Sequence, residues 1–449
     1  MLIKNATIIT WKKPNQILKD YALLIEGNQI RKIGLQAELE QEFPHEAVLD
    51  ARHQLLMPGL ICAHTHFYGL FSRGLAIPAP APSEFTEILE KLWWPLDQSL
   101  DLEDVKVCAQ VCLIDAIRHG TTLLFDHHAS PNAIDGSLEE IYEAFAETGL
   151  RGVLCYEVTD RGGSLKAEAG VAENMRMIKA VDSGHNLDGR IGAVFGMHAG
   201  LTLSDETLEK CRMALDDLTG IHIHVAEHQV DEFASMEKYG LRVIDRLNQF
   251  GFLGKNSIVA HGVHIDMREA ELLAESQTWL AHQPRSNSNN AVGLADVESM
   301  MRLGVHVCMG NDGFSNAMWD EWRTAYLAQK LVQKDPRVMG GDKVIEMAVY
   351  NNARLAQHFF PQSAGLGTIQ TGAPADLILV DYDPITEMTV ENLPWQILFG
   401  FRDSMVTTTI VDGKVLMKDR ELIGIDEHRI YAHARQRAAS VWQKYQKQF

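Results

Sequence analysis

Short apolar segments alternate with amphipathic segments over residues 59–360. Eight of the apolar segments are typical of buried strands: PGLICAHTH, TTLLFDHH, RGVLCYEVTD, GRIGAVFGMHA, GIHIHVAEH, NSIVAHGVH, QTWLAHQPRSN and GVHVCMGNDG. Between them the spacing of apolar residues predicts helices, among them 102–119, 137–148, 204–218 and 230–249. Eight strand–helix units over about 300 residues indicate an α/β protein with a (β/α)8 TIM-like barrel. A doubly wound open sheet is the alternative, but no GxGxxG motif opens a helix, so the barrel is favoured.

Both ends of the chain carry β-type patterns instead. LIKNATIIT, ALLIEGNQIRKIG and AVLDARHQLLMPG lie near the N-terminus, and ADLILVDYD, MVTTTIVDGKVLMKD and ELIGI lie near the C-terminus. We predict that residues 1–58 and 362–425 pair into one composite β-sandwich domain. The barrel would then span 59–361, and a C-terminal helix would span 426–449. Two unrelated β decorations are the alternative.

The composition of the chain argues against several classes of protein. The chain has 449 residues and a formal net charge of −19, which argues against nucleic acid or an anionic membrane as a partner. Its six cysteines form no CxxC pair, the N-terminus has no secretion pattern, and no apolar run is long enough to span a membrane. We therefore expect a cytoplasmic protein, and the sequence leaves monomer and homodimer open.

Polar or ionisable residues follow every predicted barrel strand. They are His64 and His66; Asp126, His127 and His128; Glu157 and Asp160; His198; His224, Glu227 and His228; His261 and His264; His282, Arg285 and Asn287; and Asp312. A barrel places its active site at the carboxyl ends of its strands. A purely structural explanation would scatter such residues between both strand ends, so the pattern favours a functional site.

Several of these residues suit a metal ion. His64 and His66 are two apart in a predicted strand, so both imidazoles project from one face and can reach one ion. His224 shares a face with His222, and we choose His224 because it lies nearer the strand's carboxyl end; His222 is interpreted as a packed barrel residue. Asp312 ends an apolar strand, where a buried carboxylate is costly unless it is paired or binds a metal.

The types of ligand indicate which metal ions the site could hold, and two further ionisable residues could carry protons. Three histidines and one carboxylate suit Zn²⁺ or Fe²⁺ rather than Mg²⁺ or Ca²⁺. Such a metal with an open position lowers the pKa of bound water toward ~7 and supplies hydroxide. Glu227 and His261 are proton carriers by residue type and position.

The motifs resemble those of a known family. PGLICAHTHFYGLFSRG, HVAEH, VAHGVH, HQPRSNSN and MGNDGFSN resemble the amidohydrolase superfamily, in the branch of cytosine deaminases, guanine deaminases and chlorohydrolases. HFYG, LWWPLD, DHHASPN and CYEVTDR resemble the SsnA-type aminohydrolases. The resemblance spans the whole chain.

The resemblance implies roles for individual residues. The implied metal ligands are His64, His66, His224 and Asp312, and the implied catalytic residues are Glu227, His261 and Asp312. Glu227 would protonate the leaving group, and His261 with Asp312 would accept the proton of the bound water. Binuclear members carry a metal-bridging Lys at the end of the fourth strand. Here GAVFGMHAGLT has no Lys, which implies one divalent transition metal, expected to be Zn²⁺, although the ligand set also suits Fe²⁺.

Substrate contacts are predicted at His198, Trp93, Arg161 and Asn287. Residues 67–97 form a long, proline-punctuated insertion typical of a lid. Trp93 and Trp94 either stack on a planar heterocycle or attach this lid to the barrel. Arg161 and Arg285 either bind a substrate carboxylate or carbonyl or form surface salt bridges.

These features predict a metal-dependent aminohydrolase that uses metal-bound hydroxide on a C–N bond of a planar nitrogen heterocycle. Its reaction would be deamination of a purine-, pteridine- or pyrimidine-like compound, with ammonia release. Hydrolysis of a cyclic amide or imide, or of a chlorinated ring, uses the same site and is the alternative. A non-catalytic assembly protein is disfavoured because all four candidate ligands and both proton carriers are present.

Overall fold

The computed structural model describes residues 1–216 and 219–449. Its strands are β1 (Leu2–Ile9), β2 (Ile17–Glu26), β3 (Gln29–Leu35), β4 (Val48–Asp50), β5 (Leu55–Pro58), β6 (Leu60–Thr65), β7 (Thr121–His128), β8 (Arg151–Tyr156), β9 (Ile191–Ala193), β10 (Phe195–Ala199), β11 (Ile221–Val225), β12 (Ile258–His261), β13 (Trp279–His282), β14 (His306–Met309), β15 (Leu377–Val380), β16 (Val406–Val411), β17 (Lys414–Lys418) and β18 (Glu421–Leu422).

The helices lie between these strands. They are α1 (Gln36–Glu42), α2 (Phe85–Ile88), α3 (Trp94–Asp97), α4 (Leu102–His119), α5 (Ser137–Thr148), α6 (Ser164–Asp182), α7 (Asp205–Ala214), α8 (Gln229–Tyr239), α9 (Val243–Gln249), α10 (Met267–Ser276), α11 (Pro284–Asn289), α12 (Val297–Leu303), α13 (Met318–Gln333), α14 (Gly341–Ile345), α15 (Asn352–Phe359), α16 (Leu393–Gly400) and α17 (Glu427–Gln446). Short 3-10 or π turns are η1 (Phe67–Ser72), η2 (Leu89–Trp93), η3 (Asp160–Gly162), η4 (Gly200–Thr202), η5 (Glu346–Asn351) and η6 (Asp403–Met405).

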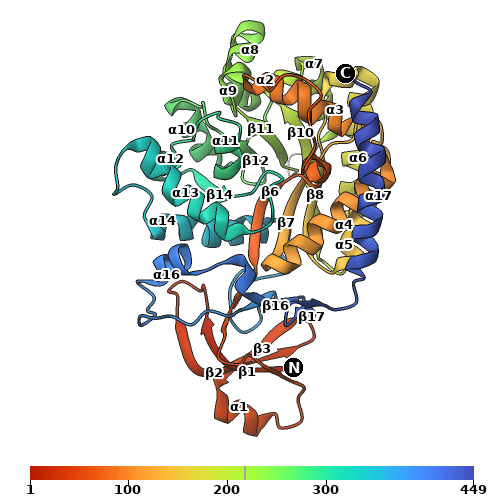
Figure 1. Cartoon of the computed structure of the whole chain (residues 1–449). Coiled ribbons are helices and arrows are strands. Elements are labelled where there is room, and N and C mark those ends of the chain that lie inside the picture. The colour runs from red at the N-terminus through yellow and green to blue at the C-terminus, as the bar shows by residue number, and fades with distance from the viewer. Residues whose placement is uncertain (217–218) are drawn as a thin grey trace.

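Parallel strands β6 to β14 form a barrel with helices outside it (Figure 1). The sequence prediction of a (β/α)8 barrel is confirmed. β9 and β10 are two parts of its fourth strand, interrupted at Val194, whose N–H donates to Leu154 O at 3.1 Å. The last strand closes on the first because the Asn311 and Asp312 N–H groups donate to His64 O at 2.9 and 3.1 Å. A Cβ on Gly310 would lie 2.6 Å from that same oxygen, so this closure requires glycine.

The closing contact places two of the predicted ligands side by side. His64 lies on the first barrel strand and Asp312 in the turn after the last one, 248 residues later in sequence, and the Asp312 N–H donates to His64 O. β6, β7 and β8 are buried along their whole length, as expected for parallel strands covered on both faces. The strand ends are therefore held rigidly by the barrel core.

Strands from both ends of the chain share one sheet below the barrel (Figure 1). Among the described residues this sheet has nine strands, and its order is β18-β17-β16-β15-β5-β1-β2-β3, with β4 beside β1. β5 and β15 pair antiparallel, with Leu56 opposite Leu379. Arg151, at the start of barrel strand β8, bonds Asp376 at 2.6 Å and Asp412 at 2.7 Å near the sheet. The sheet thus covers the amino ends of the barrel strands and leaves their carboxyl ends free.

Helix α17 runs along the barrel from the sheet toward these carboxyl ends (Figure 1). There it contacts the insertion after β6. The Trp442 indole N–H donates to Phe71 O at 2.8 Å, the Tyr445 hydroxyl to Lys91 O, and the Gln448 amide to Pro95 O at 2.7 Å. The predicted lid is consequently attached to the end of the chain.

Two general features of the chain bear on the sequence predictions. The six cysteines are buried free thiols. In the described part of the chain, no helix combines the length and the apolar character that crossing a membrane requires.

Candidate active site

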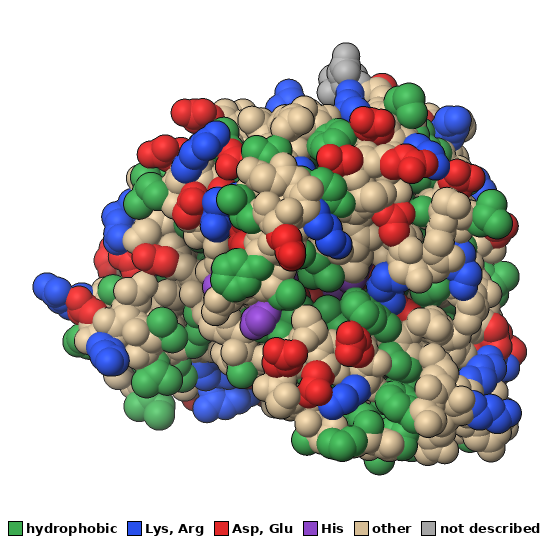
Figure 2. Space-filling view, turned by 90° about the horizontal axis from the view of Figure 1, so that it is seen from above, with side chains coloured by type: hydrophobic (Ala, Val, Ile, Leu, Met, Phe, Trp, Pro, Cys, Tyr) green, Lys and Arg blue, Asp and Glu red, His purple; other side chains and the backbone are tan. Residues whose placement is uncertain are grey.

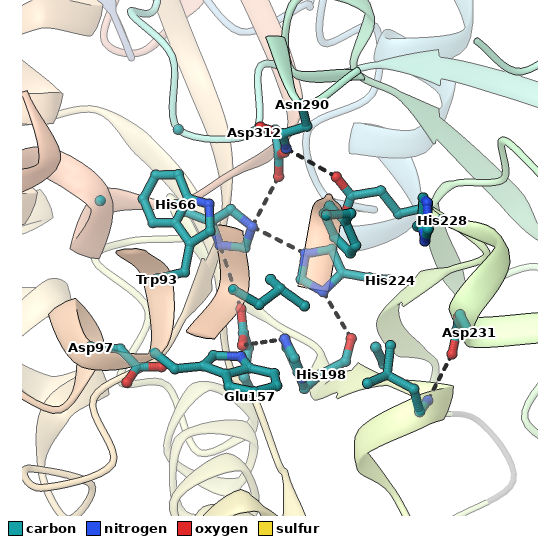
Figure 3. Close-up of a pocket in the computed structure, with 18 of the residues that line it drawn as sticks. His66, Trp93, Asp97, Glu157, His198, His224, His228, Asp231, Asn290 and Asp312 are labelled. Atoms are coloured by element: carbon teal, nitrogen blue, oxygen red, sulfur yellow. Dashed lines mark hydrogen bonds and ion pairs between the residues drawn. The ribbon is translucent and has the colours of Figure 1, made fainter. Parts of the chain in front are cut away.

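The four predicted metal ligands converge at the carboxyl end of the barrel (Figure 3). His64 and His66 come from the end of β6, His224 from β11, and Asp312 from the turn after β14. One ligand atom from each lies within 4.8 Å of the others. His64 Nε2 and His66 Nε2 are each 3.0 Å from Asp312 Oδ1, and the Nε2 atoms of His66 and His224 are 3.1 Å apart.

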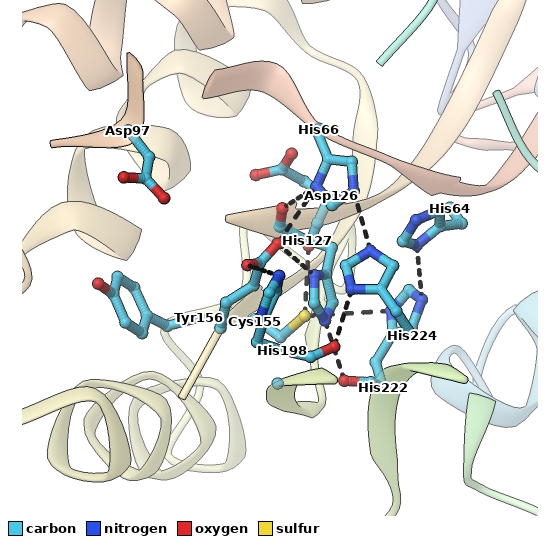
Figure 4. A network of polar contacts seen from close by, with 12 residues as sticks. His64, His66, Asp97, Asp126, His127, Cys155, Tyr156, His198, His222 and His224 are labelled. Atoms are coloured by element: carbon cyan, nitrogen blue, oxygen red, sulfur yellow. Dashed lines mark hydrogen bonds and ion pairs between the residues drawn. The ribbon is translucent and has the colours of Figure 1, made fainter. Parts of the chain in front are cut away.

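The hydrogen bonds behind these rings fix which nitrogens face each other. His66 Nδ1 donates to His127 O at 2.5 Å, and His224 Nδ1 donates to His198 O at 2.8 Å (Figure 4). When both rings are neutral, their Nε2 atoms carry lone pairs, and two lone pairs 3.1 Å apart repel unless a proton or a metal ion lies between them. His64 Nδ1 is oriented by the buried His222, 2.9 Å away. The donor set fits one divalent transition metal.

Charges in the site also favour a cation. Burial raises the pKa of Asp312, but the charge of His261 and the bonds from His64 and His66 outweigh it and hold that pKa well below its usual range. Burial lowers the pKa of His66, yet Asp312 and Glu157 outweigh it and raise that pKa to about 9. A potential that draws a proton onto a buried imidazole also draws a metal ion.

A second group of potential ligands lies next to the first. His66, His127, Glu157 and His224 also have ligand atoms within 4.8 Å of one another. However, His127 bonds Glu157 Oε1 through Nδ1 and His222 O through Nε2, each at 3.0 Å, so neither nitrogen offers a free lone pair. His66 and His224 already use Nδ1 for backbone carbonyls. His127 and Glu157 therefore orient the residues around the first ligand set instead of forming a second metal site. The absence of a Lys on the fourth strand likewise implies a single ion.

The two predicted proton carriers lie beside the ligand set. Glu227 Oε2 is 3.6 Å from His261 Nε2, and Glu227 Oε1 accepts a bond from Asn290 Nδ2 at 3.2 Å. Burial raises the pKa of Glu227 above its usual value, and the interaction with His261 opposes this shift. His261 Nδ1 donates to Asn287 Oδ1 at 2.8 Å, which leaves Nε2 as an acceptor 3.9 Å from Asp312 Oδ1. His261 holds a left-handed φ of +73°, a strain that often marks functional residues.

Three of the four predicted substrate contacts line one cavity with these groups. The cavity walls are His66, Tyr68, Gly69, Phe85, Leu89, Trp93, Trp94, Asp97, Glu157, Arg161, His198, Ala199, Leu201, His224, Glu227, His228, Asp231, Asn290, Asp312 and Gly313. Asn287 differs from the expectation. It is fully buried and bonds His261, so it orients a proton carrier instead of contacting substrate.

The arginine alternatives are resolved as well. Arg161 bonds Asp97 at 2.7 Å within the cavity wall, where its side chain is 12% exposed. Arg285 bonds the fully buried Glu321. Neither forms the surface salt bridge that we weighed from the sequence.

The predicted lid forms part of the cavity wall. η2 is a π turn, a local widening frequent at functional sites, and it leads directly into α3. Trp93, Trp94 and Asp97 from this stretch line the cavity, and Phe85 and Leu89 pack against Val292 across the mouth. Viewed from above, hydrophobic and acidic side chains surround a hollow in which histidine is visible (Figure 2). Sequence analysis gave no role to Asp97, whose only signal was its place in the insertion.

Comparisons with known proteins identify the family of this chain. Residues 55–416 match the model of the Amidohydrolase family. The chain is 31% identical over 443 residues to 5'-deoxyadenosine deaminase of Methanosarcina mazei, covering 98% of this chain and 97% of the relative. It is 33% identical over 430 residues to 5-methylthioadenosine/S-adenosylhomocysteine deaminase of Thermococcus onnurineus, covering 94% and 95%. Among solved structures, a zinc-bound adenosine deaminase from Xanthomonas campestris has the same fold, with a TM-score of 0.84, 24% identity and 98% coverage of both chains.

The chain therefore belongs to the amidohydrolase family, which confirms the resemblance read from its motifs. Enzymes of this family are metal-dependent. This protein is a hydrolase that acts on carbon–nitrogen bonds other than peptide bonds.

Proposed function

We propose that this enzyme removes an amino group from a planar nitrogen heterocycle and releases ammonia. The observation that carries the proposal is the convergence of His64, His66, His224 and Asp312 on one point, with Glu227 and His261 beside it in one cavity. The deaminase names of the full-length relatives support the same reaction class.

His64, His66, His224 and Asp312 would hold one divalent transition metal, for which Zn²⁺ is our first choice and Fe²⁺ the second. When bound, such a metal lowers the pKa of a water molecule toward ~7 and so supplies a nucleophile at neutral pH. The three imidazoles contribute Nε2 and the carboxylate contributes Oδ1.

His261 and Glu227 would move the protons of the reaction. His261 Nε2 faces Asp312, so this pair accepts the proton that the attacking water loses. Glu227, whose pKa is raised by burial, donates a proton to the ring nitrogen next to the attacked carbon. The amine then leaves as ammonia and the ring carbon keeps the water's oxygen, so one water is consumed for each ammonia released.

The cavity walls suit a flat ring. Tyr68, Phe85, Trp93 and Trp94 provide aromatic surfaces. Offset stacking on such surfaces orients a heterocycle without regard to its substituents. The aromatic walls also exclude water from the reacting groups.

Glu227→Gln tests the role assigned to this carboxyl group. Glutamine keeps the shape but carries no proton, so turnover should fall by about 10²- to 10⁴-fold. Metal content should stay unchanged because Glu227 lies outside the ligand set. Ammonia release and metal analysis on the same preparation provide both readouts.

The matched control is Glu271→Gln, on the exposed surface of α10, which should leave both readouts unchanged. Loss of the metal in Glu227→Gln would make Glu227 a ligand and contradict the assignment. Wild-type turnover that releases chloride or opens a ring without ammonia would contradict deamination itself.

A further inference from the structure

An ion pair with unused hydrogen-bonding groups lies in the wall of the catalytic cavity. Arg161 Nη2 bonds Asp97 Oδ2 at 2.7 Å, and Asp97 is 1% exposed. Asp97 Oδ1, Arg161 Nε and Nη1, and Trp94 Nε1 are also buried, yet they bond no group in the described part of the chain. The wall therefore offers one unused acceptor and three unused donors.

Unused groups of this kind are rare in protein interiors and require an explanation. Structural stability does not provide one, because burying an ion pair without satisfying its remaining atoms costs free energy. All three residues line the same cavity as Glu227 and Asp312, and Asp97 lies on a different side of it from Asp312 (Figure 3). A substrate with its amino group at the metal site would share this cavity with all three residues.

Charge limits what this wall can bind. The charges of Asp97 and Arg161 oppose each other, and Glu157 adds a further carboxylate whose charge is felt by both. Burial also raises the pKa of Asp97 to about 7, although Arg161 opposes the shift. The wall has no surplus positive charge for a substrate carboxylate or phosphate, so a neutral group that both accepts and donates fits best.

We propose that Asp97, Arg161 and Trp94 recognise a lactam edge of the substrate, in which a ring carbonyl lies beside a ring N–H. The carbonyl accepts from Arg161 and Trp94, and the N–H donates to Asp97 Oδ1. This selects aminated oxo-purines, oxo-pteridines and oxo-pyrimidines over adenine-type rings. The inference rests on the proposed deamination, which places the ring in this cavity.

A nucleoside is the rival ligand, because sugar hydroxyl groups also accept and donate hydrogen bonds. The wall has three unused donors and one unused acceptor, which favours a ligand with a carbonyl group. The Trp94 ring, whose centre is 5.2 Å from the Arg161 guanidinium carbon, favours a planar ligand. Binding measurements distinguish directly between a lactam-bearing ring and a nucleoside as the ligand.

The first experiment measures equilibrium binding to the metal-loaded Glu227→Gln protein, which holds ligand without converting it. Guanine, pterin and cytosine provide the lactam edge, and adenine and 5'-deoxyadenosine lack it. We expect at least one lactam probe to bind about tenfold or more tightly than both adenine compounds. Tighter binding of either adenine compound than of all lactam probes would overturn the inference.

The second experiment removes single groups from the wall. Trp94→Phe deletes one N–H and keeps an aromatic ring, and Asp97→Asn deletes the carboxylate charge. Each should weaken lactam binding by about tenfold and change adenine binding less, so the preference shrinks. An unchanged preference in both variants would overturn the inference. If a variant fails to fold, the preference of the Glu227→Gln protein in the first experiment decides.

Matched controls are Trp395→Phe on α16 and Asp205→Asn, which removes an arginine-bonded carboxylate outside the cavity. Neither should alter the preference. Lactam binding without ammonia release by the wild type would contradict the proposed function alone. Ammonia release from adenine compounds with no lactam preference would contradict this inference alone.

Discussion

At the scale of single residues, hydrogen bonds to backbone carbonyls decide which nitrogen His66 and His224 present, whereas side chains orient His64 and His261. The two-residue spacing of His64 and His66 was enough to predict a shared face, because side-chain direction in a strand follows from sequence alone. The partner of His261 was not predictable in this way. Asn287 lies in helix α11, after the next barrel strand, and only the folded chain places its amide oxygen against the His261 imidazole instead of in the cavity.

Glu232 provides a stability test away from the metal ligands. Its side chain is buried on α8, and Oε2 accepts a bond from Val243 N–H at 3.2 Å. Burial and the charge of Glu269 raise the pKa of Glu232 to about 8. A carboxyl whose pKa is raised on folding binds a proton more tightly in the folded state, so its contribution to stability falls as pH rises from about 4 to about 8.

Glu232→Gln should therefore stabilise the protein at alkaline pH. Glutamine keeps the acceptor and removes the charge, so its advantage over wild type should grow by about 1 kcal/mol between about pH 5.5 and pH 8.5. Urea unfolding at both pH values measures this difference. Glu237→Gln, on the exposed face of the same helix, is the control, and an advantage that shrinks as pH rises would contradict the prediction.

At the scale of elements, helices with strong end signals were predicted accurately. The helices expected over 102–119 and 137–148 are α4 and α5, which end at Gly120 and Gly149 with left-handed φ; α4 also begins with a capping box at Asp101. The helix expected over 230–249 is two helices, because Gly240 at φ +70° ends α8. The helix expected over 204–218 is α7, which ends at Ala214; residues 217–218 lie outside the described part.

Helix α17 shows what local patterns do not reveal. Its apolar spacing indicates a helix, but its contacts with residues some 350 positions earlier depend on the closed barrel. Through these contacts the end of the chain supports the stretch that carries Trp93, Trp94 and Asp97. We therefore expect α17 to affect substrate binding without touching substrate.

Tyr445→Phe combined with Gln448→Ala tests this expectation. The pair of changes removes hydrogen bonds to Lys91 O and Pro95 O, so KM should rise by about 3- to 30-fold while metal content stays constant. Steady-state kinetics and metal analysis measure both quantities. Gln436→Ala, exposed on the same helix, is the control, and an unchanged KM in the double variant would show that α17 is not needed to position the cavity wall.

At the scale of the whole molecule, the two chain ends and the barrel depend on one another. β5 and β15 pair across more than 300 residues of sequence, and the apolar face of the sheet includes Ile8, Leu23 and Leu377 from both ends. The similar strand patterns at the two ends of the chain predicted that these segments pair with each other. The order of the strands could not be predicted, because it depends on long-range pairing that no local pattern encodes.

Deleting residues 1–50 should therefore prevent stable folding. The deletion removes β1 to β4, leaves the edge of β5 without its partner β1 and takes away much of the apolar cluster that includes Leu377, so aggregation or loss of the folded chain is expected. Size-exclusion chromatography and circular dichroism of the truncated chain give the result. A soluble, metal-loaded and active truncation would show that the two ends are separate decorations.

We propose that deamination by this enzyme depends on one metal ion held by His64, His66, His224 and Asp312. Metal content and ammonia release, followed together while Zn²⁺ is added back to chelator-treated protein, test it most directly. Ammonia release from an aminated heterocycle should rise in proportion to bound metal and level off at one ion per chain, and His66→Asn should bind little metal and release little ammonia. Full activity in metal-free protein, or activity that requires two ions per chain, would contradict the account.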